Sequence, residues 1–170
     1  GSGDVTGDGR ADIITSLGEG FASHVKVFDG TNLDVVQSFF AYGAFTGGVY
    51  VAAGDVNADG LADIITGAGV GGGTHVKVFD GSGSGELASF LAYAGVDNEV
   101  RVGAGDVNSD GFADIITGLG AGDASHVKVF DGSNLNLMQS FFAYVSHLGG
   151  TYVGGVTPVP EPTTLSLLGL

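Results

Sequence analysis

The sequence predicts an all-β fold assembled from a 51-residue repeat. The segments "DVTGDGRAD", "DVNADGLAD" and "DVNSDGFAD" begin at Asp4, Asp55 and Asp106, so the interval is 51 residues both times. The chain holds 33 glycines against 3 prolines, and it lacks long runs of strong helix formers. Short runs of β-branched and aromatic residues recur at the same place in each period, which is typical of an array of short strands.

Each period contains four predicted strands. The first is "ADIIT", which follows each aspartate-rich segment directly, and the second is "HVKVF". The third is "VVQSFF", "ELASFL" or "LMQSFF", and the fourth is "VYVAAG" or "VRVGAG". Four strands in about 50 residues is the size of a propeller blade. We expect the aspartate-rich segment to join the last strand of one blade to the first strand of the next.

The repeats divide the chain into two parts. We expect three repeats within residues 1–156, at about 3–54, 55–105 and 106–156, followed by a proline-rich linker and an apolar tail over 157–170. Closed propellers typically have four to eight blades, so three blades predict an open arc or part of a larger assembly. Exposed blade faces and strand edges favour association, either of two arcs into one ring or of many arcs into a fibre.

Composition excludes several classes of partner and chemistry. The hydrophobic content of 44% is enough for a buried core. The net charge of −14 comes from 19 acidic residues against 5 basic ones. No basic patch can be assembled from so few cations, which argues against nucleic acid and anionic membrane surfaces as partners. Because the chain has no cysteine, disulfides and thiolate chemistry are also excluded.

The acidic residues are concentrated in three segments, which we call the aspartate loops: residues 4–12, 55–63 and 106–114. Three carboxylates within nine residues repel one another, and a bound cation would offset that repulsion. Oxygen ligands at alternating positions, with a glycine that permits a sharp turn, are what a calcium ion requires. We therefore predict Ca²⁺ as the cofactor, about three ions with one per repeat.

Two other interpretations of the aspartate loops compete with calcium. Asp, Asn and Gly are common turn residues, but a turn does not need a further carboxylate at a fixed offset in every repeat. An EF-hand needs a glutamate at its twelfth loop position and flanking helices. Thr15, Thr66 and Thr117 stand at that position, and β-formers surround them. A calcium loop within a β-repeat is therefore the favoured interpretation.

The pattern "GDVNADGLADIITGAG", followed by "HVKVFDG", resembles the FG-GAP or integrin-α-type calcium-binding β-propeller repeat, which also occurs in bacterial surface proteins. The match covers residues 3–154. The resemblance implies ligands from the side chains of four residues and from one backbone oxygen in each loop. In loop order, with the backbone position fourth, these are Asp4, Thr6, Asp8, Arg10 and Asp12; Asp55, Asn57, Asp59, Leu61 and Asp63; and Asp106, Asn108, Asp110, Phe112 and Asp114.

The chain departs from that family in two respects. The family's Gly-Ala-Pro element is replaced by "GAG" or "GLG", without proline. Thr6 stands where the other two loops have an amide, so we expect the first site to bind calcium more weakly.

The C-terminal segment "VTPVPEPTTLSLLGL" resembles the beginning of a PEP-CTERM sorting signal. Its Val-Pro-Glu-Pro motif is present, but "LSLLGL" is too short to span a bilayer, so we expect no membrane span in this form. The alternation of residues 164–167 suits a strand. Two arrangements are open: the tail docks on a neighbouring subunit by strand addition, or it folds back over its own blades.

The sequence gives little support for catalysis, and we predict no catalytic residues. His24, His75 and His126 recur at one place in the repeat, beside "HVKVF", which indicates a structural role. There is no Gly-x-Ser-x-Gly elbow, and the glycine-rich runs do not open a helix that could bind phosphate. The prediction is therefore that the protein is not an enzyme.

Two functions follow as expectations. The first is an extracellular calcium-binding structural protein of the cell surface or matrix, which self-associates into a homo-oligomer or a fibre through its C-terminal tail and open blade edges. The second is an adhesive or ligand-binding propeller module of a bacterial surface protein, with a glycan or protein as its partner. Both place the protein outside the cell, where calcium is abundant enough for sites of modest affinity.

Overall fold

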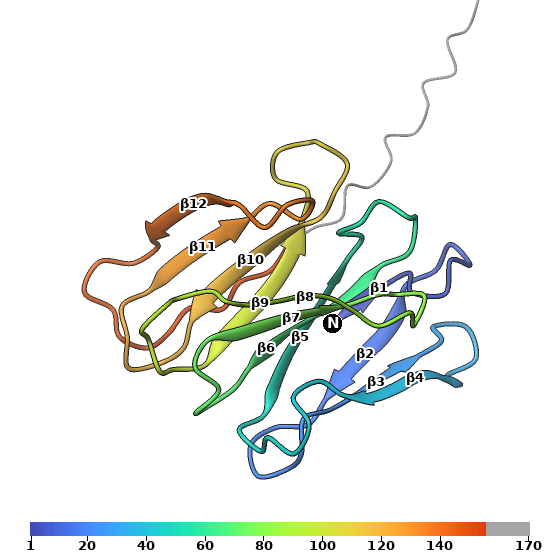
Figure 1. The fold of residues 1–170 in the computed structure, drawn as a ribbon, viewed down its shortest axis with the longest axis horizontal. Coiled ribbons are helices and arrows are strands. Elements are labelled where there is room, and N and C mark those ends of the chain that lie inside the picture. The colour runs from blue at the N-terminus through green and yellow to red at the C-terminus, as the bar shows by residue number, and fades with distance from the viewer. Residues whose placement is uncertain (156–170) are drawn as a thin grey trace, which may run out of the picture.

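A computed structural model of the chain describes residues 1–155. Its strands form three four-stranded antiparallel sheets, ordered β1-β2-β3-β4, β5-β6-β7-β8 and β9-β10-β11-β12 (Figure 1). The first sheet contains β1 (Ser2–Gly3), β2 (Asp12–Ser16), β3 (His24–Phe28) and β4 (Val35–Phe40). The second contains β5 (Val49–Gly54), β6 (Asp63–Ala68), β7 (His75–Phe79) and β8 (Glu86–Leu91). The third contains β9 (Val100–Gly105), β10 (Asp114–Leu119), β11 (His126–Phe130) and β12 (Leu137–Phe142).

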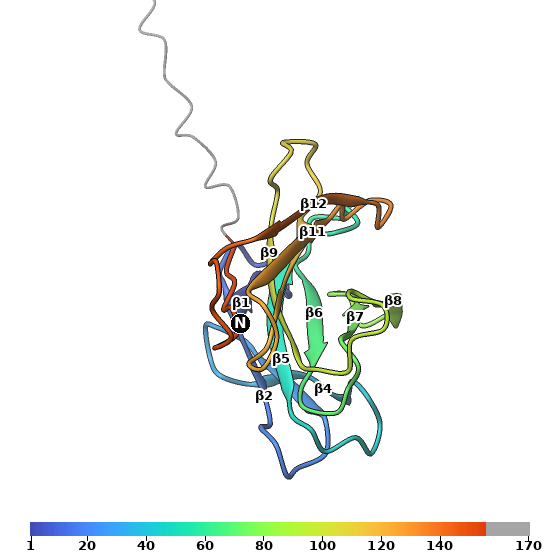
Figure 2. The same cartoon turned by 90° about the vertical axis from the view of Figure 1, so that its left-hand side faces the viewer.

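The middle sheet lies between the other two, and the described chain forms an open arc of three sheets (Figures 1 and 2). The sheets meet through their first two strands, because β5 contacts β1, β2 and β9, and β6 also contacts β9. The prediction of an all-β fold with three four-stranded blades is confirmed. No helix is present among residues 1–155, and this part of the chain therefore contains no helix long and apolar enough to cross a membrane.

The expected position of the aspartate loops within the blades is wrong. The second loop joins β5 to β6, and these strands pair with each other over six residues, from Val49↔Ala68 to Gly54↔Asp63. The first and third loops likewise join β1 to β2 and β9 to β10. Each loop therefore closes a hairpin inside one sheet instead of linking two sheets. The strand before each loop is the innermost strand of the sheet that follows, so the sheets are offset by one strand from the sequence repeats.

The residues of "HVKVF" alternate between two faces of the strand, and the two faces are buried to different extents. Val76 and Val78 of β7 are fully buried, whereas His75, Lys77 and Phe79 are half-buried on the opposite face. Successive residues of a strand point to opposite faces, so β7 presents valines to one neighbour and longer side chains to the other. The pairing of β7 with β8 shifts register between Val78 and Phe79, and the same shift occurs in the other two sheets.

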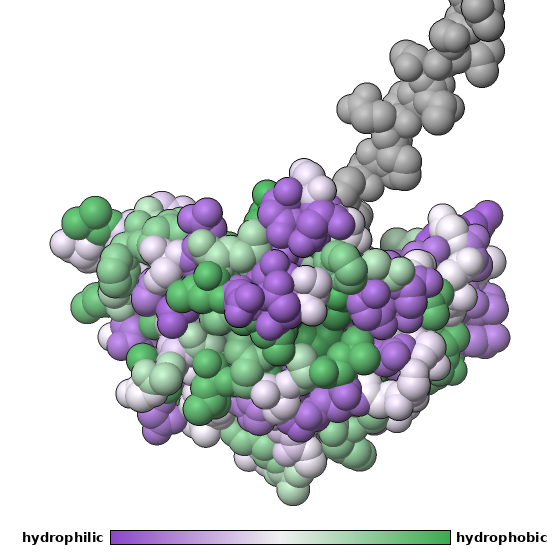
Figure 3. All heavy atoms as spheres, turned by 45° about the horizontal axis from the view of Figure 1, so that its top comes forward, coloured by the Kyte–Doolittle hydropathy of each residue, from purple (hydrophilic) through white to green (hydrophobic). Residues whose placement is uncertain are grey.

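The core consists of two apolar clusters, one in each space between sheets. Ile64 belongs to the cluster between the first two sheets, and Ile65 belongs to the cluster between the second and third. Both side chains are fully buried. The middle sheet is thus covered on both faces, which explains why all six residues of β6 are buried. Apolar residues also lie among polar ones on the outer surface (Figure 3).

Residues 151–155 follow the third sheet and run along its innermost strands. The Thr151 amide donates to the Leu119 carbonyl at 2.8 Å, just as the Val49 amide donates to the Leu17 carbonyl at 3.1 Å. This segment therefore lies where the innermost strand of a further sheet would begin. The linker and tail predicted over 157–170, and their docking by strand addition, lie outside the described residues.

Candidate metal-binding loops

The first aspartate of each loop accepts backbone hydrogen bonds from the residues that follow it. Asp4 Oδ1 accepts from the Gly7 and Asp8 amides at 2.7 and 3.1 Å, and Asp4 Oδ2 accepts from the Gly9 amide at 2.8 Å. Asp106 accepts the three corresponding bonds in its own loop, and Asp55 accepts two of them, from the Asp59 and Gly60 amides. Each loop therefore curls around the carboxylate of its first residue.

The next two ligand positions extend that curl. Asn57 Oδ1 accepts from the Asp59 amide at 2.9 Å, and Asp59 Oδ1 accepts from the Leu61 amide at 2.8 Å. The third loop repeats both bonds through Asn108 and Asp110. In bonds of this kind, which are typical of Asx turns, a side-chain oxygen accepts from the backbone amide two residues further along the chain.

Two positions in each loop have a left-handed backbone. Ala58 has φ of 58° and Gly60 has φ of 91°, and the third loop has the same pattern at Ser109 and Gly111. In the first loop both positions are glycine, at Gly7 and Gly9. Glycine adopts this conformation without steric cost. The left-handed backbone of the turn therefore explains why an Asp-Gly pair recurs at the same place in all three loops.

The last aspartate of each loop is fully buried and ties the loop to a second turn. Asp63 Oδ2 accepts from the Val56 amide and Oδ1 accepts from the Gly81 amide, both at 2.9 Å. Asp12 and Asp114 make the same two kinds of bond, including those from Gly30 and Gly132. These carboxylates therefore fasten the aspartate loop to the turn after the "HVKVF" strand.

Sequence reasoning missed the three glycines that donate to the buried aspartates. A signal was present, since each glycine of "VFDG" stands 18 residues after its aspartate in every repeat. A Cβ atom at Gly81 would lie 2.5 Å from the Ala62 carbonyl oxygen. Only glycine therefore fits the close approach of the two turns at this point.

The negative charges of the second loop repel one another. Burial raises the pKa of Asp63 to about 6, while the Gly81 and Val56 amides lower it and the negative charges of Asp59 and Asp55 raise it. The ionised form of Asp63 is therefore less favourable than that of an ordinary aspartate, and a nearby positive charge would offset this cost. Asp12 shifts in the opposite direction: burial raises its pKa, but hydrogen bonds from the Gly30, Thr6 and Val5 backbone lower it by more.

The donor chemistry of the loops fits a hard cation. Carboxylate and amide oxygens lie on each loop, and the carbonyls of Arg10, Leu61 and Phe112 accept no hydrogen bond from any described residue. Within residues 1–155, however, no three His, Cys, Asp or Glu side chains are gathered around one point as a metal-binding group. The carboxylates of the loop instead face backbone amides, as the hydrogen bonds above describe.

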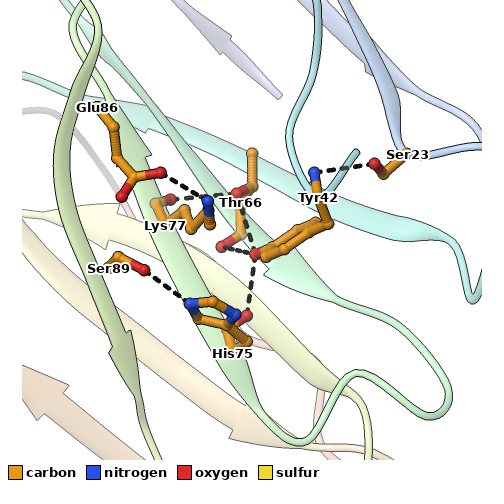
Figure 4. Close-up of polar contacts among 7 residues, drawn as sticks. All are labelled: Ser23, Tyr42, Thr66, His75, Lys77, Glu86 and Ser89. Carbon is orange, nitrogen blue, oxygen red and sulfur yellow. Dashed lines mark hydrogen bonds and ion pairs between the residues drawn. The ribbon is translucent and has the colours of Figure 1, made fainter. Parts of the chain in front are cut away.

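The recurring histidines connect neighbouring strands. Nε2 of His24, His75 and His126 lies 2.8, 2.7 and 2.9 Å from the hydroxyl of Ser38, Ser89 and Ser140, respectively. Figure 4 shows the His75–Ser89 pair, which spans β7 and β8. This repeated cross-strand contact gives the histidines a structural role.

A half-buried tyrosine connects the first sheet to the second. The Tyr42 hydroxyl lies 3.0 and 2.9 Å from the carbonyl oxygens of Thr66 and His75, and it accepts a hydrogen bond from Thr66 Oγ1 at 3.1 Å (Figure 4). Lys77 Nζ lies 5.8 Å from the centre of the Tyr42 ring. This contact was not predicted from the sequence, although an "AY" pair follows the third predicted strand in every repeat.

The contact recurs between the second and third sheets. The Tyr93 hydroxyl lies 3.0 and 2.9 Å from the carbonyl oxygens of Thr117 and His126, and Thr117 Oγ1 donates to it at 3.2 Å. Lys128 Nζ lies 4.7 Å from the centre of the Tyr93 ring. Tyr144 occupies the corresponding position after the third sheet, and its side chain is 62% exposed.

Comparison with known proteins identifies similar folds. No protein-family model matches the chain, and no curated protein matches it. Among solved structures, it is similar to the exotype rhamnogalacturonan lyase YesX, with a TM-score of 0.56 and 15% identity over 82% of this chain and 32% of the lyase. Rhamnogalacturonan lyase YesW gives a TM-score of 0.56 and 17% identity over 85% of this chain and 34% of the lyase. The chain spans about a third of the length of these two structures, and the likeness shows a shared β architecture.

Proposed function

We propose that the chain is a non-enzymatic, extracellular calcium-binding structural protein that self-associates. The observation that carries the proposal is the repeated loop, which curls around the carboxylate of its first aspartate and ends in a fully buried aspartate at the same place in three sheets. Each loop closes a hairpin and is tied to a second turn of the same sheet. A cation bound there would link the innermost strand to the turn after the third strand and stiffen the whole sheet.

The ligands proposed for the second loop are the side chains of Asp55, Asn57 and Asp59, the Leu61 carbonyl and the buried Asp63. The charge pattern supports this choice, because burial and the charges of Asp59 and Asp55 raise the pKa of Asp63. A divalent cation would remove that repulsion and hold all three carboxylates ionised. The equivalent ligands of the other loops follow from the repeat.

Thermal unfolding tests the calcium assignment. Calcium binds the folded state but not the unfolded chain, so it stabilises the fold by about 2.7 kcal/mol per site at a hundredfold excess over Kd. Scanning calorimetry in millimolar Ca²⁺ and in excess chelator should give a clearly lower melting temperature in chelator. The same melting temperature under both conditions would contradict the assignment.

Calorimetric titration with CaCl₂ then locates the sites. The chain should bind about three ions, one per loop. Asp59→Asn keeps a hydrogen-bond acceptor for the Leu61 amide but removes a charge, so it should weaken binding at one site selectively. Asp97→Asn makes the same change of charge at an exposed residue outside the loops, and it should leave all the sites intact. Equal effects of the two substitutions would exclude the loop as the site.

A second candidate function is glycan binding by an adhesive module. A groove of about 460 Å³ lies between the second and third sheets, and Asn57, Leu87, Phe112 and Asn134 are among its lining residues. Amide and aromatic side chains suit a sugar, and the similar structures are titled as rhamnogalacturonan lyases. Incubation with rhamnogalacturonan distinguishes the candidates: the structural proposal expects neither binding nor cleavage, whereas saturable binding would favour the module and shortened polymer would indicate an enzyme.

A further inference from the structure

The first sheet exposes a face that the repeat buries elsewhere. We call it the Thr15 face, and it consists of Ala11, Ile13, Thr15 and Leu17 on and beside β2. Ile13 is 45% exposed and Leu17 is 42% exposed, and Ala11 and Thr15 are exposed as well. The corresponding residues of the second and third sheets are all buried: Ala62, Ile64, Thr66 and Ala68, and Ala113, Ile115, Thr117 and Leu119.

The third sheet exposes the opposite half of the same contact. We call it the Tyr144 face, and it consists of Phe141, Ala143 and Tyr144 at and after the end of β12. Phe141 is 49% exposed, Tyr144 is 62% exposed, and Ala143 is exposed. Ala41 and Ala92, which correspond to Ala143, are only 3% and 2% exposed. The face is therefore built from residues whose counterparts are buried or half-buried wherever another sheet follows.

The two contacts inside the chain show what fits these faces. At each contact, an alanine and a tyrosine after the last strand of one sheet meet the second and third strands of the next. Phenylalanine rings also pair across both contacts, with centres 4.7 Å apart for Phe39–Phe79 and 5.0 Å apart for Phe90–Phe130. At the loop end, the Ala62 amide donates to the Asp4 carbonyl and the Ala113 amide donates to the Asp55 carbonyl, each at 2.7 Å.

We propose that the Tyr144 face of one copy docks on the Thr15 face of a second copy and repeats the contact found twice inside the chain. This inference rests on the self-association proposed above and specifies its contact. The Tyr144 hydroxyl meets the Thr15 and His24 carbonyls of the second copy, Phe141 meets Phe28, and the Asp106 carbonyl accepts from the Ala11 amide. Lys26 takes the place that Lys77 and Lys128 occupy over the buried tyrosines.

The segment after the third sheet is compatible with this docking. Gly118 lies against the Thr151 carbonyl and the Val153 side chain, as Gly67 lies against the Val100 carbonyl and the Val102 side chain. Residues 151–153 thus lie where the innermost strand of a following sheet begins.

The contact is heterologous, because it joins two different faces. Each copy carries the Thr15 face on its first sheet and the Tyr144 face on its third sheet. Repetition gives either a two-copy ring or an open chain of copies. Both assemblies use the same contact, so single substitutions on either face test it.

Sedimentation velocity in millimolar Ca²⁺ over a range of concentrations provides the test. The unaltered chain should form dimers or a ladder of larger species. Tyr144→Arg should weaken association by roughly thirtyfold or more, because it buries an unpaired charge at the centre of the contact. Val145→Arg is the matched control: Val145 is 91% exposed, and the corresponding Gly43 and Ala94 are exposed at both internal contacts. The control variant should associate like the unaltered chain.

Mixing two variants tests the head-to-tail arrangement. Ile13→Arg should block the Thr15 face, and Leu17→Arg is the second choice if circular dichroism shows that Ile13→Arg unfolds the chain. Tyr144→Arg keeps an intact Thr15 face, and Ile13→Arg keeps an intact Tyr144 face. Each variant alone should remain a monomer, and the mixture should form a 1:1 heterodimer and nothing larger.

The outcomes separate this inference from the proposed function. If both variants still associate like the unaltered chain, the contact is wrong while self-association stands. If both are monomers but the mixture forms no heterodimer, head-to-tail docking is wrong. If the unaltered chain stays a monomer at every concentration, self-association and this contact both fail, and the calcium assignment is still decided by calorimetry.

Discussion

Tyr93 and Tyr144 occupy the same position of the repeat but have opposite environments. The Tyr93 hydroxyl contacts two carbonyl oxygens and a threonine hydroxyl of the next sheet, and the residue is 3% exposed. Tyr144 is 62% exposed. Each repeat carries the tyrosine side of the contact between sheets, and the third repeat carries it although no further sheet follows within the described residues. Burial at this position is therefore decided by the presence of a neighbouring sheet and not by the residues of the sheet itself.

The largest expected effect of that difference is at the isoleucines of the second strands. Ile64→Ala should destabilise the fold by about 2–5 kcal/mol, because it removes a fully buried side chain from a packed core. Ile13→Ala should cost less than about 1 kcal/mol in the monomer, since Ile13 is already 45% exposed. Urea denaturation at low protein concentration measures both values. Similar losses at the two positions would show that the Thr15 face is structurally equivalent to the internal contact.

Removal of a tyrosine hydroxyl should lower the stability of the fold by less than Ile64→Ala does, and the loss should again be larger at the internal contact than at the exposed face. Tyr93→Phe removes the hydroxyl donor that lies between the Thr117 and His126 carbonyls, and it leaves Thr117 Oγ1 with the Lys128 carbonyl as its remaining acceptor. We expect a loss of about 1–3 kcal/mol. Tyr144→Phe should change monomer stability by less than about 0.5 kcal/mol. If Tyr93→Phe proves neutral in urea denaturation, the hydroxyl does not stabilise the contact between sheets.

Most of the fold was predictable from the repeat, because periodicity and alternation are local properties. The four strands per period follow from "ADIIT", "HVKVF" and the two runs after them. The pairing of β5 with β6 was not predictable in the same way. A repeat can be divided at any point along its length, and only the three-dimensional pairing shows that the strand before each aspartate loop belongs to the sheet after it.

The site was predictable in part, for a similar reason. The curl of the loop around Asp4, Asp55 and Asp106 is a local feature that turn chemistry explains. The bond from Gly81 to Asp63 joins residues 18 positions apart and depends on the packing of two turns. The tyrosine contacts depend on how the sheets stack, since Tyr42 and Thr66 belong to different sheets. Contacts between elements therefore required the structure.

Alkaline pH should also distinguish the tyrosines at the internal contacts from the exposed Tyr144. Burial raises the pKa of Tyr93 to about 12, and it also raises the pKa of Tyr42 above its ordinary value of 10. The unfolded chain loses these protons near pH 10, before the folded chain does. Stability is therefore fully present below pH 10 and declines as the pH rises toward the folded pKa. The loss should reach about 1 kcal/mol per tyrosine by pH 11.

Urea denaturation at about pH 9 and pH 11 measures that decline. Tyr93→Phe should make the decline smaller, whereas Tyr144→Phe should leave it unchanged in the monomer. If stability declines equally in the unaltered chain, Tyr93→Phe and Tyr144→Phe, the decline does not arise from the tyrosine contacts.

The smallest expected effect concerns the first loop compared with the second. Asn57 Oδ1 accepts a hydrogen bond from the Asp59 amide, whereas Thr6 has a shorter side chain at the equivalent position. Asn57→Thr should therefore weaken calcium binding at the second loop, and Thr6→Asn should strengthen it at the first. Titration calorimetry measures both changes. Unchanged affinities would show that this side chain does not bind the ion.

The most direct test is electron microscopy of the assembled chain in millimolar Ca²⁺, at a resolution that shows side chains. Copies should join head to tail, with the Tyr144 hydroxyl of one copy within hydrogen-bond distance of the Thr15 and His24 carbonyls of the next. Copies joined through two identical faces, or through surfaces away from Tyr144 and Thr15, would contradict this prediction.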